Sequence, residues 1–93
     1  MNRLVSADRV INVGKVLAYK RFEDDFRTLP KEVQGRVLRA LSHIQADPFR
    51  GQKLKGVAIG RWRYRVGDYR IRYDIEGSAI HLHIVRHRKE VYR

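Results

Sequence analysis

The sequence contains no cysteine, only two prolines and no long run of apolar residues. The lack of cysteine excludes a disulfide framework, a thiolate zinc site and a cysteine nucleophile. Without a long apolar run the chain has no expected membrane span, and its first residues do not resemble a secretory signal. Acidic residues are also few, 10 against 21 Lys and Arg, so the 93 residues carry a formal net charge of +11. We therefore expect one small cytoplasmic domain whose basic surface binds a polyanion, most often nucleic acid.

The first half of the chain predicts a strand followed by two helices. Residues 1–14 show no clear period and are interpreted as an N-terminal extension, which leaves residues 15–93 as the single domain. Residues 15–19 (KVLAY) have the β-branched character of a strand. Two apolar stripes at helical spacing follow, and the second helix is expected to start at Pro30 and to end at Asp47. The first stripe comprises Tyr19, Phe22, Phe26 and Leu29, and the second comprises Val33, Val37, Leu38, Leu41 and Ile44.

Strict alternation of apolar and polar residues predicts three antiparallel strands in the second half. Residues 49–60, with three glycines and three basic residues, are expected to form a loop before them. Two-residue turns at Gly67-Asp68 and Gly77-Ser78 then set the register of the strands. The predicted apolar face comprises Trp62, Tyr64, Val66, Tyr69, Ile71, Tyr73, Ile75, Ile80, Leu82 and Ile84. The expected fold class is α+β, with an N-terminal strand and a helical hairpin packed on one face of an antiparallel sheet in the order β-α-α-β-β-β.

The same register gathers arginines on the opposite face of the sheet. It places Arg65 opposite Arg70 and Arg63 opposite Arg72, and like charges directly opposite one another destabilise a sheet by up to about 1 kcal/mol per pair. Fifteen of the 21 basic residues are arginines, whose planar fork of donors suits phosphate better than a lysine does. We therefore interpret this face as a phosphate-binding surface and not simply as a solvated one.

Histidines on the third strand invite a metal hypothesis. The register places His81 beside Asp74 and His83 beside Arg72, and the spacing of the two histidines would suit two metal ligands. A third ligand is not evident in the sequence, and the neighbouring arginines would repel a cation, so neither a metal nor another cofactor is expected. His43, on the second helix, is interpreted as structural or exposed.

A basic cleft can nevertheless cleave RNA without a metal. The ribose 2′-hydroxyl attacks the adjacent phosphate, and the protein has to align the attack, neutralise the phosphorane and manage two protons. Arginines suit the second task but cannot act as bases, because their pKa exceeds about 12. Tyr92 and His87 are the candidate proton carriers, with His83 behind them.

Five stretches carry a resemblance to a known family: residues 29–37 (LPKEVQGRV), 47–48 (DP), 53–56 (KLKG), 62–73 (WRYRVGDYRIRY) and 85–93 (VRHRKEVYR). They resemble the RelE/ParE superfamily of toxins from bacterial and archaeal toxin–antitoxin systems. The resemblance covers roughly residues 15–93 and implies the expected order of elements. It implies, for the RelE branch, cleavage of messenger RNA in the decoding site of a translating ribosome with a 2′,3′-cyclic phosphate as product. The ParE branch shares the fold but poisons DNA gyrase.

Carried over by position, the resemblance implies a set of site residues. The late arginine of the family falls on Arg86 or on Arg88, depending on one gap. Some members have lysines where this chain has Arg63 and Arg65, so proton transfer would pass here to Tyr92 or His87. The predicted catalytic residues are Arg63, Arg65, Arg70, Arg86, His87 and Tyr92. The predicted RNA-binding residues are Lys53, Lys55, Arg61, Arg72, His83, Arg88 and Lys89.

The joint presence of these residues favours the RelE branch. The hypothesis is a ribosome-dependent, metal-independent endoribonuclease that inhibits translation and is neutralised by a cognate antitoxin. Its expected partners are that antitoxin, the ribosome and messenger RNA, with DNA reached only through the antitoxin complex and no membrane involved. Two alternatives stay open: a ParE-like gyrase inhibitor, and a non-catalytic RNA- or ribosome-binding module that uses the same basic face.

Overall fold

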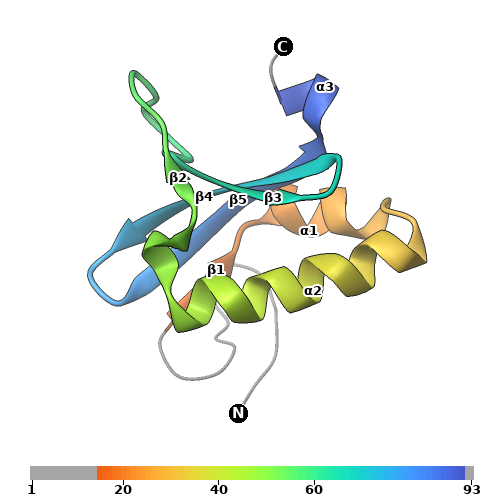
Figure 1. Cartoon of the computed structure of the whole chain (residues 1–93), viewed down its shortest axis with the longest axis horizontal. Helices are drawn as coiled ribbons and strands as arrows, with labels where there is room; N and C mark the ends of the chain where they lie inside the picture. Colours follow the sequence, from red (N-terminus) through yellow and green to blue (C-terminus); the bar gives the residue numbers. More distant parts are fainter. Residues whose placement is uncertain (1–14, 92–93) are drawn as a thin grey trace.

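The structure is a computed structural model that describes residues 15–91, and these form an α+β domain (Figure 1). The predicted fold class is confirmed. The expected extension at residues 1–14, together with Tyr92 and Arg93, lies outside the described residues. In chain order the elements are β1 Lys15–Ala18, α1 Lys20–Arg27, α2 Lys31–Ala46, the 3-10 helix η1 Pro48–Arg50, β2 Gln52–Lys53, β3 Trp62–Val66, β4 Tyr69–Glu76, β5 Ala79–His87 and α3 Arg88–Val91.

The strands form one five-stranded sheet in the order β1-β5-β4-β3-β2. β3, β4 and β5 pair antiparallel, as the alternation predicts, whereas β1 joins the edge of β5 in the parallel direction. The register between β3 and β4 is the predicted one, with Val66 opposite Tyr69 and Trp62 opposite Tyr73. Because the side-chain period of a strand is two, this register confirms which residues of β3 and β4 share a face.

Helices α1 and α2 cover one face of the sheet, as Figure 1 shows, and the core lies between these two layers. Phe22 of α1 and Val37 and Ile44 of α2 are fully buried. The prediction that Leu38 belongs to the buried stripe is wrong, since 47% of this residue is exposed. Ala40 takes its place, because residues 33, 37, 40, 41 and 44 follow one helix face and Leu38 lies a further 100° around the helix from Val37. Sheet residues in the same core include Val66, Ile71, Tyr73, Ile80, Leu82 and Val85.

The turn between the two helices is closed by Gln34. Its side-chain amide nitrogen donates to the carbonyl oxygens of Phe26 at 3.0 Å and Leu29 at 3.1 Å. The Phe26 carbonyl lies at the end of α1 and also accepts from the backbone N–H of Leu29 at 3.1 Å, and the Leu29 carbonyl lies in the turn beyond the helix. Gln34 therefore fixes the helical hairpin to which the sheet is packed. No helix among residues 15–91 is both long and apolar enough to cross a membrane.

The register between β4 and β5 shifts by one residue, which corrects part of the prediction. His81 lies opposite Asp74, as expected, but Tyr73 pairs with Leu82 and Arg72 pairs with Ile84. His83 is the additional residue between these pairs, so the prediction that it lies opposite Arg72 is wrong. An additional residue turns every later side chain to the other face. Ile84, predicted to be on the apolar face, therefore lies on the arginine-bearing face, and Val85 is buried instead.

The predicted loop at residues 49–60 contains η1 and the two-residue strand β2. The Tyr73 hydroxyl donates to the carbonyl oxygen of Pro48 at 2.8 Å and anchors this segment. Burial raises the pKa of Tyr73 to about 12, so the phenol keeps its proton. A side chain at position 51 would place its Cβ 2.3 Å from the Tyr73 hydroxyl, and only glycine permits this contact.

Candidate nucleic-acid interface

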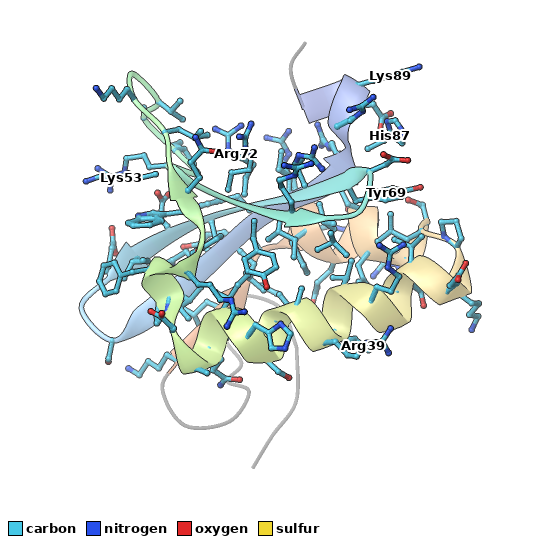
Figure 2. All side chains as sticks on the ribbon, viewed as in Figure 1. Arg39, Lys53, Tyr69, Arg72, His87 and Lys89 are labelled. Carbon is cyan, nitrogen blue, oxygen red and sulfur yellow. The ribbon has the colours of Figure 1, made fainter. Side chains whose placement is uncertain are left out.

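The face of the sheet opposite α1 and α2 carries Arg63 and Arg65 from β3 and Arg70 and Arg72 from β4. We call these four residues the arginine face. The predicted pairs are confirmed, with Arg65 opposite Arg70 and Arg63 opposite Arg72. Figure 2 shows Arg72 pointing away from the helices, between the β2–β3 connection and α3. The side chains are thus gathered on one flank of the sheet, where the hairpin helices do not cover them.

Arg70 is the most enclosed of the four residues, with 5% of its surface exposed. Its Nη1 donates to the carbonyl oxygens of Gly67 at 2.8 Å and Tyr69 at 2.9 Å, both at the β3–β4 turn. Its Nε is buried and has no hydrogen-bond partner among the described residues. A buried guanidinium with an unused donor is costly, because neither water nor an acceptor replaces the lost hydration.

The surroundings of Arg70 are cationic. Burial is the largest cause that lowers the pKa of Arg70, and repulsion from Arg65, Arg63 and Arg88 lowers this pKa further. Among residues 15–91, only Asp68 raises the pKa of Arg70. An anion bound here would remove the repulsion and would be held by preorganised donors.

The carboxylates that form ion pairs within residues 15–91 do so with partners outside the arginine face. Asp24 pairs with Lys20 and Arg27, Asp25 with Arg86, Asp74 with Arg61 and His83, and Glu76 with His81. Within residues 15–91, none of them forms an ion pair with Arg65, Arg70 or Arg72. Arg63 donates through Nη2 to the side-chain oxygen of Gln52. The positive charges of Arg65, Arg70 and Arg72 are therefore left for an external anion.

A cavity of about 340 Å³ lies along β3, beside η1 and β2. It is lined by Arg50, Gly51, Gln52, Arg63, Tyr64 and Arg65. Arg50 was not among the predicted site residues, because only the fold of η1 and β2 brings it beside β3. Its one signal in the sequence is its position just before the KLKG stretch. Three guanidinium groups around one cavity are a suitable setting for phosphate oxygens.

Asp74 organises the other end of the same sheet face. It accepts hydrogen bonds from the backbone N–H groups of Gly60 and Arg61, each at 2.8 Å, from Arg61 Nε at 3.3 Å and from His83 Nε2 at 2.9 Å. Burial alone would raise the pKa of Asp74, but the hydrogen bonds from Arg61, Gly60 and the charge of His83 outweigh it and lower the pKa. Arg61 and His83, both predicted to bind RNA, are thus already engaged by a carboxylate.

Arg72 lies between the two ends and is held by backbone acceptors. Its Nε donates to the carbonyl oxygen of Gly60 at 2.6 Å, and its Nη2 donates to that of Ile59 at 3.4 Å. Burial and repulsion from Arg63 lower the pKa of Arg72, and Asp74 opposes this shift. The β2–β3 connection therefore fixes the direction of this guanidinium.

The predicted residues of the C-terminal segment separate into two groups. Arg86 Nε donates to the carboxylate of Asp25 on α1 at 3.1 Å, and the same oxygen accepts from the Val85 N–H at 3.2 Å. Arg86 is therefore committed to the free edge of β5. Arg88 is exposed, and repulsion from its charge lowers the pKa of Arg70. In the register of β4 and β5, however, Arg86 lies directly opposite Arg70, so both candidates for the late arginine stay open.

His87 lies on the helix-packed side of β5, away from the arginine face. It pairs with Tyr69, and the two rings meet edge to face with centroids 5.5 Å apart. Its Nδ1 accepts a hydrogen bond from the backbone N–H of Lys89 at 3.2 Å, the arrangement of a side chain capping the start of a helix, here α3. The described geometry thus gives His87 a structural task, and Tyr92 lies outside the described residues.

The predicted lysines lie at the margins of the site. Lys53 and Lys55 are exposed near β2, and Lys89 is exposed on α3. Figure 2 places Lys53 and Lys89 toward opposite ends of the sheet, with Arg72 between them. Across residues 15–91, no three His, Asp or Glu side chains are grouped as metal ligands. The described site is therefore a cluster of arginines flanked by exposed lysines.

Known proteins that are similar to this chain belong to toxin–antitoxin systems. A family model described as the ParE toxin of type II toxin–antitoxin system, parDE, matches residues 15–92. Toxin RelE3 of Methanocaldococcus jannaschii is 31% identical over 84 residues, which cover 84% of this chain and 94% of that protein.

Solved structures agree with these matches. The toxin of the RelB–RelE complex from Methanococcus jannaschii is 28% identical with a TM-score of 0.67, and the match covers 82% of this chain and 94% of the other. The RelBE2 complex from Mycobacterium tuberculosis has a TM-score of 0.72 at 24% identity, covering 80% and 96% of the two chains, and supports the fold. Together with the family model, these findings show that the chain belongs to the RelE/ParE superfamily of toxins from type II toxin–antitoxin systems.

Proposed function

We propose that this toxin is an endoribonuclease that acts in the cytoplasm on messenger RNA bound to the ribosome and thereby inhibits translation. The observation that carries the proposal is Arg70, a buried guanidinium surrounded by other cations and lacking a carboxylate partner among the described residues. Such an arrangement costs stability unless an anion completes it. The name of the relative RelE3 supports the RelE branch.

In the proposed reaction the ribose 2′-oxygen attacks the adjacent phosphorus atom. The bond from phosphorus to the 5′-oxygen of the next nucleotide breaks, which leaves a 2′,3′-cyclic phosphate and a 5′-hydroxyl. Negative charge accumulates on the non-bridging oxygens in the transition state. Arg63, Arg65 and Arg70 would neutralise it, a task for which fixed donors in a partly dehydrated site are effective.

Two protons have to move in this reaction: one leaves the 2′-hydroxyl and one joins the 5′-oxygen. Arginine is a poor carrier, because its guanidinium stays protonated. His87 caps α3 on the other side of the sheet, and His83 is held by Asp74. Tyr92 is therefore the first residue to test as a proton carrier, and positioning by the ribosome would supply much of the remaining rate enhancement.

The RNA backbone would extend beyond the scissile phosphate over the flanking cations. Lys53 and Lys55 would contact it on the β2 side, and Arg88 and Lys89 on the α3 side. Arg61, Arg72 and His83 would contact nucleotides nearer the Asp74 end. These side chains supply the salt-dependent part of the affinity and position the chain without reading its sequence.

A cognate antitoxin is the second proposed partner. The related structures from Methanococcus jannaschii and Mycobacterium tuberculosis are complexes of toxin and antitoxin. We expect an acidic segment of the antitoxin to cover the arginine face and to compete with RNA, because both ligands require the same uncompensated cations. Contact with DNA would occur only through the antitoxin.

A gyrase inhibitor is the second candidate function, because the matching family model is described as a ParE toxin. It predicts DNA breaks linked to gyrase and no new ends in messenger RNA. The two functions place different demands on Arg70, since only RNA cleavage requires charge neutralisation at a reacting phosphate.

The deciding experiment incubates the purified toxin with programmed ribosomes and maps the 5′ ends of the messenger RNA. New ends should appear only with ribosomes present, and Arg70→Met should reduce them strongly. Arg39→Met is the matched control, because Arg39 lies on α2 on the helix side of the molecule (Figure 2). If the wild-type toxin yields no new ends but stabilises gyrase–DNA breaks, the second function replaces the first. Toxicity with neither activity would identify a non-catalytic binding module.

A further inference from the structure

A second cavity, of about 410 Å³, lies on the sheet face that bears Arg72. Ile84 of β5 and Ile59 of the β2–β3 connection contribute apolar surface, and Tyr19, Arg72 and His83 complete the walls. Lys20 and Arg21, at the start of α1, also line it. The cavity therefore combines an apolar interior with planar polar groups and two cations.

Ile84 is on this face only because of the shift in register between β4 and β5. It lies opposite Arg72, where the simple alternation would have placed a polar residue. Ile59 is 66% exposed. Two isoleucines beside a strongly basic surface leave apolar area in contact with water, and a ligand with an apolar face would cover it.

The polar groups around the two isoleucines are fixed in position. Gly60 and Ile59 hold the Arg72 guanidinium through their carbonyl oxygens, at 2.6 and 3.4 Å. Asp74 holds the His83 ring through Nε2 at 2.9 Å, and Tyr19 packs beside His83 with ring centroids 5.0 Å apart. Planar guanidinium and aromatic groups are the usual stacking partners of unpaired bases.

The cavity is close enough to Arg70 for one nucleotide to reach both. Arg72 is two residues further along β4, which corresponds to about 7 Å in a strand. A nucleotide adjoining a phosphate held at Arg70 can therefore reach the cavity. Arg21 is available to the next phosphate, whereas Lys20 already pairs with Asp24.

We propose that this cavity holds one unstacked nucleobase of the RNA, next to the scissile phosphate. The inference rests on the proposed function and deepens it by assigning a base-binding subsite to Ile59, Ile84, Arg72 and His83. An acidic peptide would satisfy Lys20 and Arg21 but would leave the two isoleucines and the planar walls without a matching group. A nucleotide satisfies the apolar, planar and cationic groups together.

The test compares nucleotides with a sugar phosphate that lacks a base. The full-length toxin, labelled with ¹⁵N, is titrated with AMP, CMP, UMP or GMP and, in parallel, with ribose 5-phosphate. At least one nucleotide should shift the amide signals of Ile59, His83 and Ile84 and should bind about 10-fold more tightly than ribose 5-phosphate, the size expected for stacking of one base. Equal affinities, or shifts confined to Lys20 and Arg21, would overturn the proposal.

Ile84→Ser should remove most of the difference between nucleotide and ribose phosphate. Leu38→Ser is the matched control, because it makes the same kind of change at an exposed position on α2 and should retain the difference. The amide spectra establish that both variants are folded. If Ile84→Ser is folded and still prefers nucleotides by the wild-type factor, the cavity does not bind the base.

Two further readouts separate this inference from the proposed function and from a protein ligand. Selective nucleotide binding without cleavage on the ribosome would overturn the proposed function and retain the base subsite. If Ile84→Ser still cleaves messenger RNA on the ribosome and its base preference is unchanged, the proposed function is retained and the base subsite is overturned. Signals of Ile59 and Ile84 that respond to an acidic peptide but to none of the nucleotides would assign the cavity to a protein and overturn the inference.

Discussion

The two ends of the arginine-bearing sheet face differ in whether their cationic side chains are paired with a carboxylate. At the Asp74 end, Arg61 and His83 share one buried carboxylate, which also accepts two backbone hydrogen bonds. At the other end, Arg65, Arg70 and Arg88 crowd together without a carboxylate partner among residues 15–91. We call these the closed end and the open end. A face that only had to remain hydrated would not need a buried arginine, so the contrast distinguishes charge used for folding from charge kept for a ligand.

The largest expected effect is at the open end and concerns Arg70→Met. We expect the rate of messenger RNA cleavage to fall about 100- to 1,000-fold, as when one preorganised donor to a transition-state oxyanion is removed. The free energy of unfolding should fall by no more than about 1 kcal/mol, because the lost hydrogen bonds to Gly67 and Tyr69 are offset by relief of repulsion and burial of an apolar chain. Urea denaturation and primer extension measure the two quantities. If Arg70→Met loses both its fold and its activity, Arg70 is needed for folding, and the proposed difference between the two ends is wrong.

The next effect decides between the two candidates for the late arginine. Arg88→Ala should lower cleavage about 10- to 100-fold, since Arg88 lies in the cation cluster around Arg70. Arg86→Ala should act mainly on stability, because it leaves the half-buried Asp25 without its cation. Primer extension at saturating toxin, combined with thermal unfolding, compares the two. The opposite assignment follows if Arg86→Ala loses cleavage while its unfolding temperature is unchanged.

A smaller effect is expected at the closed end, where Asp74→Asn should cost about 1–2 kcal/mol of stability at pH 7. The pKa of Asp74 is lowered in the folded protein, so the carboxylate stabilises the fold above the pKa of an unfolded Asp, about 3.9. This stabilisation is lost as the pH falls through the folded-state pKa. Unfolding measured from pH 7 down to pH 3 should therefore show the wild type and Asp74→Asn converging below about pH 4. A constant difference over this range would exclude ionisation of Asp74 as its cause.

The β3–β4 hairpin could be predicted in detail, whereas β5 could be predicted only in part. Alternation and a two-residue turn are local signals, and together they fix the pairing of Arg65 with Arg70. The shift at Arg72 depends on how β5 packs, and its one local trace is the adjacent apolar pair Ile84 and Val85. Either residue of this pair could continue an apolar stripe, so alternation alone assigns the wrong one.

The candidate site shows the same limit. The gathering of arginines on one flank follows from the register, but the burial of Arg70 depends on carbonyl groups of the turn and on neighbours from three segments. Arg86 lies opposite Arg70, beside the arginine face as predicted, yet its guanidinium pairs with Asp25, which is 61 residues away in the sequence. Contacts of this kind arise from tertiary packing and leave no pattern in the local sequence.

The smallest expected effect is on the salt dependence of RNA binding and compares one arginine from each end. Arg65 has no carboxylate partner within the described residues, so we expect it to displace counterions from one phosphate of a bound single strand. Arg65→Ala should then lower the slope of log K against log salt concentration by about 0.7. Arg61 is already paired with Asp74, and Arg61→Ala should change the slope by clearly less. Fluorescence anisotropy with a short labelled RNA at several salt concentrations gives both slopes. Equal changes for the two variants would mean that Asp74 does not withhold Arg61 from RNA, and the two ends would then differ in structure but not in their availability to the ligand.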